Sequence, residues 1–359
     1  MNLNNSFLDT VKEGLNGSFV GLFDGLPKMD RYTNGVQKGR YYLIGGDSSV
    51  GKTTFADFMI LNLWEDAKNR NIPIKIFYYS LEISKADKIA KWISYFIFKN
   101  HKIEINPNRI LGRVKDKFLT KDEYKLVEDT YNSMQEIFSC MEIIDNTCNP
   151  TSVWEHMIRY YESTGNLQRE DNNNRYSKML YYTPNDTNAI TVVVIDHIGL
   201  LANEKNTITL KDIIDKMSKY FIVLKNIFNT TVIAVQQFST DLLQARRQQV
   251  LQMTPNKRVL AITPTRLDFG DSKATYRDAE VVIGLTKPSQ FDIDVVMGMN
   301  CSPDGLGSNL TLSYIMKNRY GQSGKILSLF MYATVNTIYE IDKDHSDNYY
   351  ELTKKINNG

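Results

Sequence analysis

Residues 41–54 read YYLIGGDSSVGKTT, and the pattern G-x-x-x-x-G-K-T within them decides the fold. The apolar run 41–44 predicts a strand, and a helix is expected from about Thr53. Glycines between a strand and a helix let consecutive backbone N–H groups converge on a phosphate, which the positive end of the helix dipole also attracts. The motif therefore predicts a phosphate-binding loop formed by Gly46, Asp47, Ser48, Ser49, Val50, Gly51, Lys52, Thr53 and Thr54.

Side chains in and around this loop are candidates for acting on a bound nucleotide. Lys52 is expected to reach the β- and γ-phosphates, and the Thr53 hydroxyl is expected to ligate Mg²⁺. Asp196 ends the β-branched run TVVVID, and the carboxyl ends of parallel strands face one crevice, so Asp196 is the predicted acidic partner of Mg²⁺. Glu82 follows a second apolar strand and has two interpretations: it orients the attacking water, or it is an ordinary acid at the start of a helix.

Apolar runs alternate with helical patterns along most of the chain. Strands are predicted at 74–79, 191–196, 231–235, 281–285, 312–316 and 326–332, and helices at 84–99, 121–138, 151–163 and 210–228. This order predicts an α/β fold: a mostly parallel twisted sheet flanked by helices, whose closely spaced late strands become antiparallel. Residues 165–189 are rich in Asn and Asp and show no periodicity, which we interpret as a mobile surface insertion.

Composition limits the classes of protein to consider. The 359 residues contain 43 Lys and Arg against 41 Asp and Glu, a net charge of +2, so a generally polycationic nucleic-acid coat is excluded. The longest apolar runs are far shorter than the roughly 20 residues that a membrane span needs, and the polar N-terminus does not resemble a signal peptide. Three scattered cysteines do not form a disulfide framework. We expect a cytoplasmic protein with no membrane partner.

One segment stands out by its local charge. Between Leu242 and Leu267 the chain has basic residues and no acidic one, which makes this the clearest candidate surface for nucleic-acid phosphates; the alternative is a solvated loop. The basic residues are Arg246, Arg247, Lys257, Arg258 and Arg266. Phosphate contacts carry no base sequence, so we expect binding that is independent of sequence and sensitive to salt.

Five motifs, in order, resemble those of a known family. They are residues 25–54, ending in GGDSSVGKTT, then YYSLEIS (78–84), VVVIDHIGLL (192–201), VIAVQQFS (232–239) and KNRYGQSG (317–324). The set is similar to the RecA-fold motor domain of DnaB-type replicative helicases, over about residues 25–340. The resemblance implies a RecA-like P-loop ATPase that forms a ring, usually a hexamer, translocates on single-stranded DNA and unwinds a fork, with ATP and Mg²⁺ as cofactors and a primase or loader as further partners.

The resemblance also implies a role for individual residues. Glu82 matches the glutamate of the S-L-E motif that acts as catalytic base on water, and Gln237 matches the glutamine that senses the γ-phosphate and couples it to the DNA loops. Lys317 and Arg319 match the K-x-R pair that reaches across a subunit interface into the neighbour's ATP. Lys273 matches a second DNA-loop segment more loosely. These assignments, with Lys52, Thr53 and Asp196, complete the catalytic and DNA-binding set.

The chain departs from the family in several places. About 24 residues precede the motor, so we expect the family's N-terminal collar and its primase contact to be missing, as would suit a phage-like short form. We divide the chain into an arm (1–24), a motor (25–341) and a polar tail (342–359). The arm's apolar stripe, Phe7, Leu8, Val11 and Leu15, packs either on its own domain or on a neighbouring subunit. His197 stands where the family usually has Tyr, and we interpret it as a packing position or one that supports Asp196.

Two other functions stay open at this point. The string KNRYG also resembles the K-N-R-F-G motif of RadA-type branch-migration proteins, although the chain lacks their four-cysteine zinc module. A RecA-fold assembly protein, whose ATP binding only organises a ring, is the alternative from another class.

Overall fold

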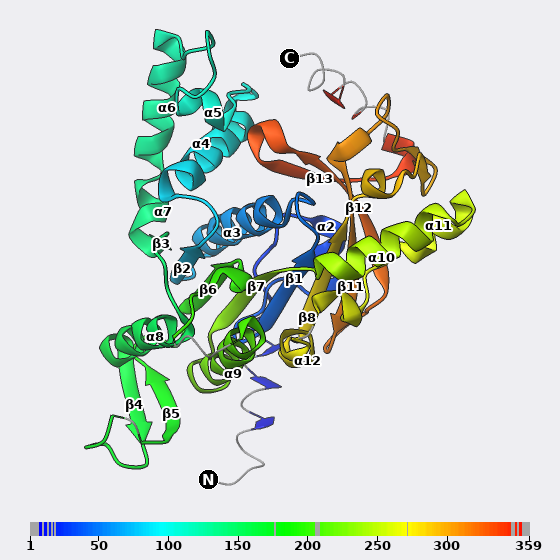
Figure 1. The fold of residues 1–359 in the computed structure, drawn as a ribbon. Coiled ribbons are helices and arrows are strands. Elements are labelled where there is room, and N and C mark those ends of the chain that lie inside the picture. Colours follow the sequence, from blue (N-terminus) through cyan, green and yellow to red (C-terminus); the bar gives the residue numbers. More distant parts are fainter. Residues whose placement is uncertain are drawn as a thin grey trace.

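A nine-stranded sheet forms the centre of the computed structural model (Figure 1). The structure describes residues 7–345, except 9–10, 13, 16, 18, 176, 205–208 and 271, together with residues 349 and 352–353. Its strands are β1 (Tyr41–Gly46), β2 (Ile74–Ser80), β3 (Met141–Ile144), β6 (Ile190–Asp196), β7 (Thr231–Gln237), β8 (Val281–Thr286), β11 (Leu310–Asn318), β12 (Lys325–Tyr332) and β13 (Thr337–Ile341). The order is β13-β12-β11-β8-β1-β7-β6-β2-β3. Strands β8 to β3 in this order run parallel, and β11, β12 and β13 pair antiparallel. The predicted fold class is confirmed.

The register of the parallel strands brings the predicted site residues to one edge. At the end of β1, Gly46 lies opposite Gln237 of β7. Further along the sheet, Asp196 of β6 lies opposite Ser80, which ends β2 two residues before Glu82. Because these strands are parallel, their carboxyl ends and the loops that follow them meet at the same edge of the sheet.

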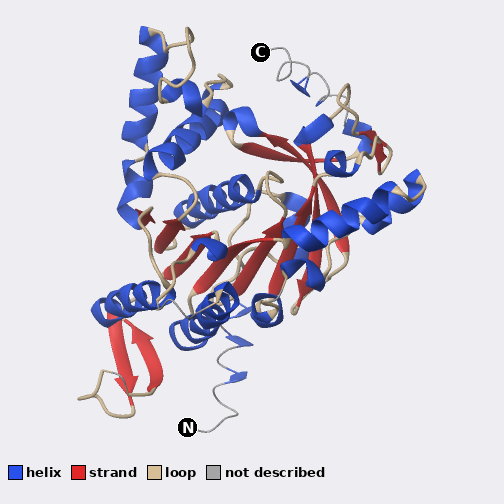
Figure 2. Ribbon diagram, viewed as in Figure 1, coloured by secondary structure: helices blue, strands red, loops and turns tan. Residues whose placement is uncertain are grey.

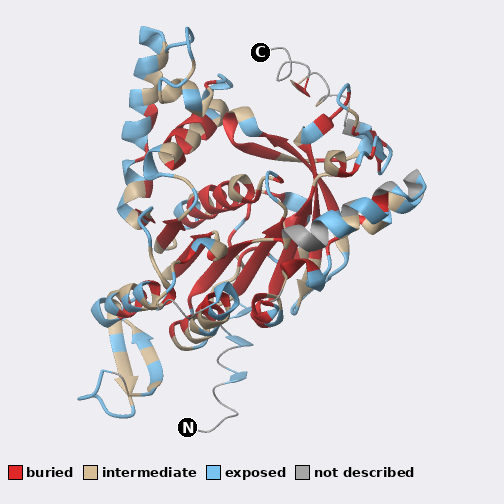
Figure 3. Ribbon diagram, in the orientation of Figure 1, coloured by how far each residue is buried: buried red, intermediate tan, exposed pale blue. Residues whose placement is uncertain are grey.

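Helices cover both faces of the sheet (Figures 1 and 2). One face carries α3 (Lys52–Asn69) and α4 (Lys85–His101), and the other carries α8 (Pro150–Thr164), α9 (Leu210–Phe228) and α12 (Ala274–Asp278). Successive side chains of a strand point to opposite faces. Tyr42 and Ile44 therefore pack in the core beneath α3, whereas Tyr41 and Leu43 pack against α9. Figure 3 shows the resulting buried central layer.

Smaller elements complete the chain. They are α2 (Pro27–Thr33), α5 (Pro107–Ile110), α6 (Lys121–Ser133), α7 (Gln135–Cys140), the short strands β9 (Val295–Val296) and β10 (Met299–Asn300), and the 3-10 turns η1 (Ile198–Leu200), η2 (Arg266–Phe269), η3 (Pro288–Phe291), η4 (Gly307–Asn309), η5 (Ala333–Val335) and η6 (Lys343–His345). The helix predicted over 121–138 is thus divided into α6 and α7.

The ends of the surface insertion predicted over 165–189 form a hairpin, which the sequence analysis did not predict. Strands β4 (Gly165–Arg169) and β5 (Met179–Pro184) pair antiparallel and project from the body of the molecule (Figure 1). Leu167, Met179 and Tyr182 pack against the core between the sheet, α8 and α9. These apolar residues anchor the hairpin, and the Asn-rich stretch between the strands conceals their pattern in the sequence.

The basic segment after Gln237 contains helices that the sequence analysis did not predict. It forms two helices, α10 (Thr240–Leu251) and α11 (Pro255–Ala261), which extend from the body of the molecule (Figure 1). The core positions Val250 and Ile262 are buried beside β11 and β12, which explains why the segment is ordered into helices.

The two ends of the chain are described only in part. In the described part of the arm, Phe7, Leu8, Val11 and Leu15 are exposed, so they do not pack on this subunit's own core. Most of the predicted polar tail after 345 lies outside the described residues.

Candidate active site and nucleic-acid surface

The phosphate loop connects β1 to α3, as predicted. Gly51 caps the start of α3 with φ 95°, a conformation that glycine adopts at little cost. A Cβ on Gly51 would lie 2.3 Å from Sδ of Met331, so a larger residue would require the Met331 side chain to move. The backbone N–H groups at the beginning of α3 have no partners within the helix, which suits them to bind phosphate.

Lys52 begins α3 and points its side chain into the protein. Its side chain is almost fully buried, and Nζ donates to the backbone carbonyl of Asp47 at 2.6 Å. Burial lowers the pKa of Lys52, and the nearby carboxylates of Glu82 and Asp196 raise it. A cation held among carboxylates in a buried site is well placed to bind phosphate oxygens.

Thr53 and Asp196 meet although they lie far apart in the sequence. Thr53 Oγ1 donates to Asp196 Oδ1 at 3.2 Å, and Asp196 is 1 % exposed. A hydroxyl and a carboxylate are the hard oxygen ligands that Mg²⁺ prefers, and this ion commonly takes one or two protein ligands with phosphates and water. Among the described residues no group of three or more His, Cys, Asp or Glu could hold a metal. The pair therefore fits Mg²⁺ bound together with a nucleotide.

A cavity of about 390 Å³ lies over the phosphate loop. Its lining includes Glu82 and Gln237 together with Lys52 and Thr53, so the structure brings these four predicted residues to one cavity. It also includes residues that the sequence analysis missed: Lys287, Ser308, Asn309, Met331 and Ala333. Lys287 directly follows the buried strand β8, and a cation at the carboxyl end of a parallel strand is the signal that could have revealed it. Burial lowers the pKa of Lys287.

Gln236, the neighbour of Gln237, connects this edge to α12. Its amide nitrogen donates to the Phe269 carbonyl at 3.2 Å, and its carbonyl oxygen accepts from Thr275 Oγ1 at 2.7 Å. Both bonds are buried, so Gln236 fixes the end of β7 to Phe269 and to α12, which begins directly after Lys273.

His197 follows Asp196 and is partly buried. Desolvation lowers its pKa, whereas Glu82 and Asp196 raise it. Its ring lines a neighbouring cavity that also contains Gln236 and Gln237. This location agrees with a supporting position beside Asp196.

Lys317 and Arg319 lie at the opposite, amino edge of the sheet. Lys317 Nζ donates to the carbonyls of Tyr276, Arg277 and Ala279 at the end of α12. Burial and the adjacent Arg319 lower the pKa of Lys317 to about 8. Arg319 donates to the Arg277 carbonyl at 2.9 Å, and its side chain is half exposed. The structure of one subunit therefore does not bring this pair to its own phosphate loop.

The basic segment divides into paired and exposed residues. Arg246 forms an ion pair of 2.5 Å with Asp268, which is 1 % exposed, and Arg258 donates to the carbonyls of Met253 and Asp292. These two side chains support α10 and α11. Lys257, Arg266 and Lys273 are exposed, whereas the side chain of Arg247 lies outside the described residues.

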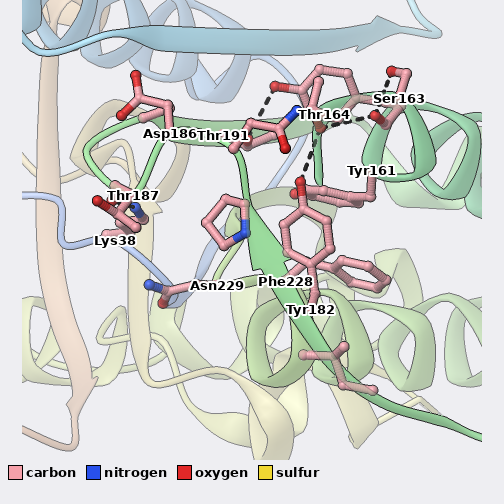
Figure 4. Close-up of a pocket in the computed structure, with 15 residues that line it drawn as sticks. Lys38, Tyr161, Ser163, Thr164, Tyr182, Asp186, Thr187, Thr191, Phe228 and Asn229 are labelled. Carbon is pink, nitrogen blue, oxygen red and sulfur yellow. Dashed lines mark hydrogen bonds between the residues drawn. The ribbon is translucent and has the colours of Figure 1, made fainter. Parts of the chain in front are cut away.

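A second cavity, of about 480 Å³, lies at the amino edge beside the hairpin (Figure 4). Tyr160, Tyr182 and Phe228 line it, and Lys38 Nζ there donates to the Thr187 carbonyl at 2.8 Å. The phosphate loop and the Thr53–Asp196 pair belong to the other edge, so the predicted nucleotide chemistry belongs to the cavity there.

Comparison with known proteins agrees with this geometry. The family model "DnaB-like helicase C terminal domain" matches residues 21–337. The chain belongs to this family. A protein of Trieres chinensis named "Probable replicative DNA helicase" is 26 % identical over 276 residues, which are 76 % of this chain and 49 % of that protein. The chain thus spans about half the length of this curated relative.

Two solved structures share the fold of this DnaB-like domain. One, described as an ATPase domain, has a TM-score of 0.67 at 20 % identity, covering 95 % of this chain and all of that one. A DnaB-like replicative helicase, described together with its interactions with primase, has a TM-score of 0.65 at 18 % identity, covering 95 % of this chain and 67 % of that one. No helix within the described part of the chain is both long and apolar enough to cross a bilayer.

Proposed function

We propose that this chain is the motor of a ring-forming, ATP-dependent DNA helicase that translocates on single-stranded DNA and unwinds the duplex ahead. The observation that carries the proposal is the meeting of the Thr53–Asp196 pair with Lys52, Glu82 and Gln237 at one edge of the sheet. Membership of the DnaB-like family supports the substrate class.

The residues of the cavity have distinct roles in this proposal. Lys52 and the start of α3 bind the phosphates of ATP, and Thr53 and Asp196 hold Mg²⁺, which neutralises phosphate charge when it is bound. Glu82 orients the attacking water and accepts its proton, and Gln237 reports the state of the γ-phosphate through β7. Asp196 and Gln237 end buried strands, and Lys52 and Thr53 begin α3, so regular structure holds these four groups in place before ATP binds.

The position of Arg319 supports a ring. Since Arg319 lies at the amino edge and the phosphate loop at the carboxyl edge, a head-to-tail assembly is needed for one subunit's arginine to complete its neighbour's site. An arginine supplied in trans stabilises transition-state charge. The exposed apolar stripe of Phe7, Leu8, Val11 and Leu15 is a second surface suited to a neighbouring subunit.

Unwinding of a forked DNA with a 5′ single-stranded tail tests the proposal. Wild-type protein is expected to separate the strands only with ATP and Mg²⁺. Glu82→Gln and Arg319→Ala are expected to bind a fluorescent ATP analogue as the wild type does, yet to lose at least about 100-fold in DNA-stimulated turnover. ATPase without unwinding would favour branch migration, and nucleotide binding without turnover would favour an assembly protein. Hydrolysis that survived Arg319→Ala would refute the role of this residue across the interface.

A further inference from the structure

A buried polar network lies directly behind Asp196. Lys88 of α4 and Asp57 of α3 are both 0 % exposed, and Lys88 Nζ lies 3.0 Å from Asp57 Oδ1. The hydroxyl of Tyr78, on β2, donates to Asp57 Oδ1 at 2.9 Å and accepts from Lys88 Nζ at 2.9 Å. The network thus joins two helices to strand β2 inside the hydrophobic core.

The same groups also reach Asp196. Lys88 Nζ and the Tyr78 hydroxyl each lie 3.4 Å from Asp196 Oδ2, whereas Oδ1 of that carboxylate accepts from Thr53. One oxygen of Asp196 is therefore held from behind by the network, and the other faces the phosphate loop.

A buried ion pair is a costly way to connect two helices. Removing charges from water carries a large penalty, and apolar residues of similar size often serve a core equally well. An α3–α4 connection that costs less is present nearby, where Lys99 and Glu65 form an ion pair while both remain partly exposed. The additional feature of the Lys88 network is its contact with Asp196.

We propose that Lys88, Asp57 and Tyr78 are positioning residues that hold the Asp196 carboxylate in the orientation that binds Mg²⁺. The inference deepens the proposed function, because it rests on Thr53 and Asp196 holding the ion that accompanies ATP. Groups behind a metal ligand fix its orientation, and their removal typically weakens metal affinity about 10–100-fold. Lys88 and Asp57 carry opposite charges, so the pair as a whole leaves the net charge near Asp196 unchanged.

The test compares two double variants that each remove one α3–α4 ion pair. Asp57→Leu/Lys88→Met replaces both charged members of the network at once, so neither Asp57 nor Lys88 is left behind as a charge without its partner, and the Asp196 carboxylate loses its support. Glu65→Leu/Lys99→Met is the matched control on the same two helices. The readout is the binding of a fluorescent ADP analogue, first in EDTA and then across a series of Mg²⁺ concentrations, with circular dichroism to show that each variant is folded.

The Asp57→Leu/Lys88→Met variant is expected to bind the analogue in EDTA with wild-type affinity, and to need at least about tenfold more Mg²⁺ for the half-maximal gain in affinity. The control is expected to match the wild type in both conditions. An unchanged Mg²⁺ requirement in the folded Asp57→Leu/Lys88→Met variant would overturn the inference. If wild-type protein itself showed no Mg²⁺-dependent binding, the proposed nucleotide site would fail instead.

Tyr78→Phe decides the question if Asp57→Leu/Lys88→Met does not fold. This substitution removes only the hydroxyl that bridges Asp57 and Asp196 and leaves the ion pair in place. We expect it to raise the Mg²⁺ requirement about threefold or more, with unchanged binding in EDTA. A wild-type requirement in Tyr78→Phe would show that the network only supports the core.

Discussion

Gly51 is the residue on which the shape of the phosphate loop depends most directly. Its φ of 95° lies in the region that residues with a Cβ rarely adopt, and Met331 from β12 closes the space where a side chain would be. The loop therefore contacts a side chain from a strand that is distant in the sequence and that β11 and β8 separate from β1 in the sheet.

Replacing Gly51 by Ala separates these two constraints. Gly51→Ala is expected to lower the free energy of unfolding by about 1–2 kcal/mol through its backbone conformation, with a further loss through the clash with Met331. In a Met331→Ala background the clash is absent, so Gly51→Ala should there cost only the loss due to its backbone conformation, and the difference between the two backgrounds measures the clash. Urea denaturation of the single and double variants measures both, and equal stability of wild type and Gly51→Ala would contradict the expectation.

The part of the site that could be predicted from the sequence depends on local pattern, and the part that could not depends on contacts between residues distant in the sequence. Lys52 and Thr53 belong to one contiguous motif, and Asp196 ends a strand whose buried character is plain in the sequence, so the local pattern was sufficient to propose these three residues. Lys287 and Lys88 reach the site only through the order of strands and the packing of α4. A lysine on a helical face gives no sign in the sequence that it is buried against a carboxylate.

At the scale of elements, α10 and α11 are helices that the sequence analysis did not predict. Arg246, on α10, pairs with the buried Asp268 of η2, which precedes the exposed Lys273. Basic residues in one stretch of sequence thus serve two purposes, because some satisfy buried carboxylates and others face solvent. The hairpin β4–β5 was likewise not predicted from the sequence. A polar stretch separates its few apolar anchors, so their spacing shows neither the repeat of a helix nor that of a strand.

The two kinds of basic residue predict different defects. Arg246→Ala leaves Asp268 buried and unpaired, and it is expected to lower the free energy of unfolding by about 3 kcal/mol. Lys273→Ala should leave stability unchanged, weaken binding to single-stranded DNA, and reduce the slope of log K against log salt by about 0.7. Urea denaturation and fluorescence anisotropy at several salt concentrations measure these effects. A wild-type salt slope in Lys273→Ala would place this residue outside the DNA surface.

At the scale of the whole molecule, tyrosines make the core sensitive to high pH. Tyr41, Tyr78 and Tyr161 are buried on the two faces of the sheet, and desolvation raises the pKa of each hydroxyl well above its ordinary value near 10. Burial likewise raises the pKa of Tyr314 to about 12. These groups stay protonated in the folded chain when the unfolded chain has already ionised.

Stability is therefore expected to fall as the pH rises above about 10. In that range the folded state binds more protons than the unfolded state, so each fully buried tyrosine lowers the free energy of unfolding by about 1.4 kcal/mol at pH 11. Urea denaturation at pH 8, 10 and 11 measures the loss. Tyr41→Phe should reduce the pH dependence, whereas phenylalanine at the exposed Tyr181 should leave it unchanged. A flat profile between pH 8 and 11 would contradict this account.

The separation of Lys52 and Arg319 to opposite edges of one sheet has a genetic consequence. A strand of six or seven residues spans about 20 Å, so no chain can supply both residues to a single site. Two defective alleles, Lys52→Ala and Arg319→Ala, are then expected to complement each other when they are expressed together. In the proposed ring, an Arg319→Ala chain would contribute its intact phosphate loop beside a Lys52→Ala chain that contributes its intact arginine, and two defective copies would together form a whole site.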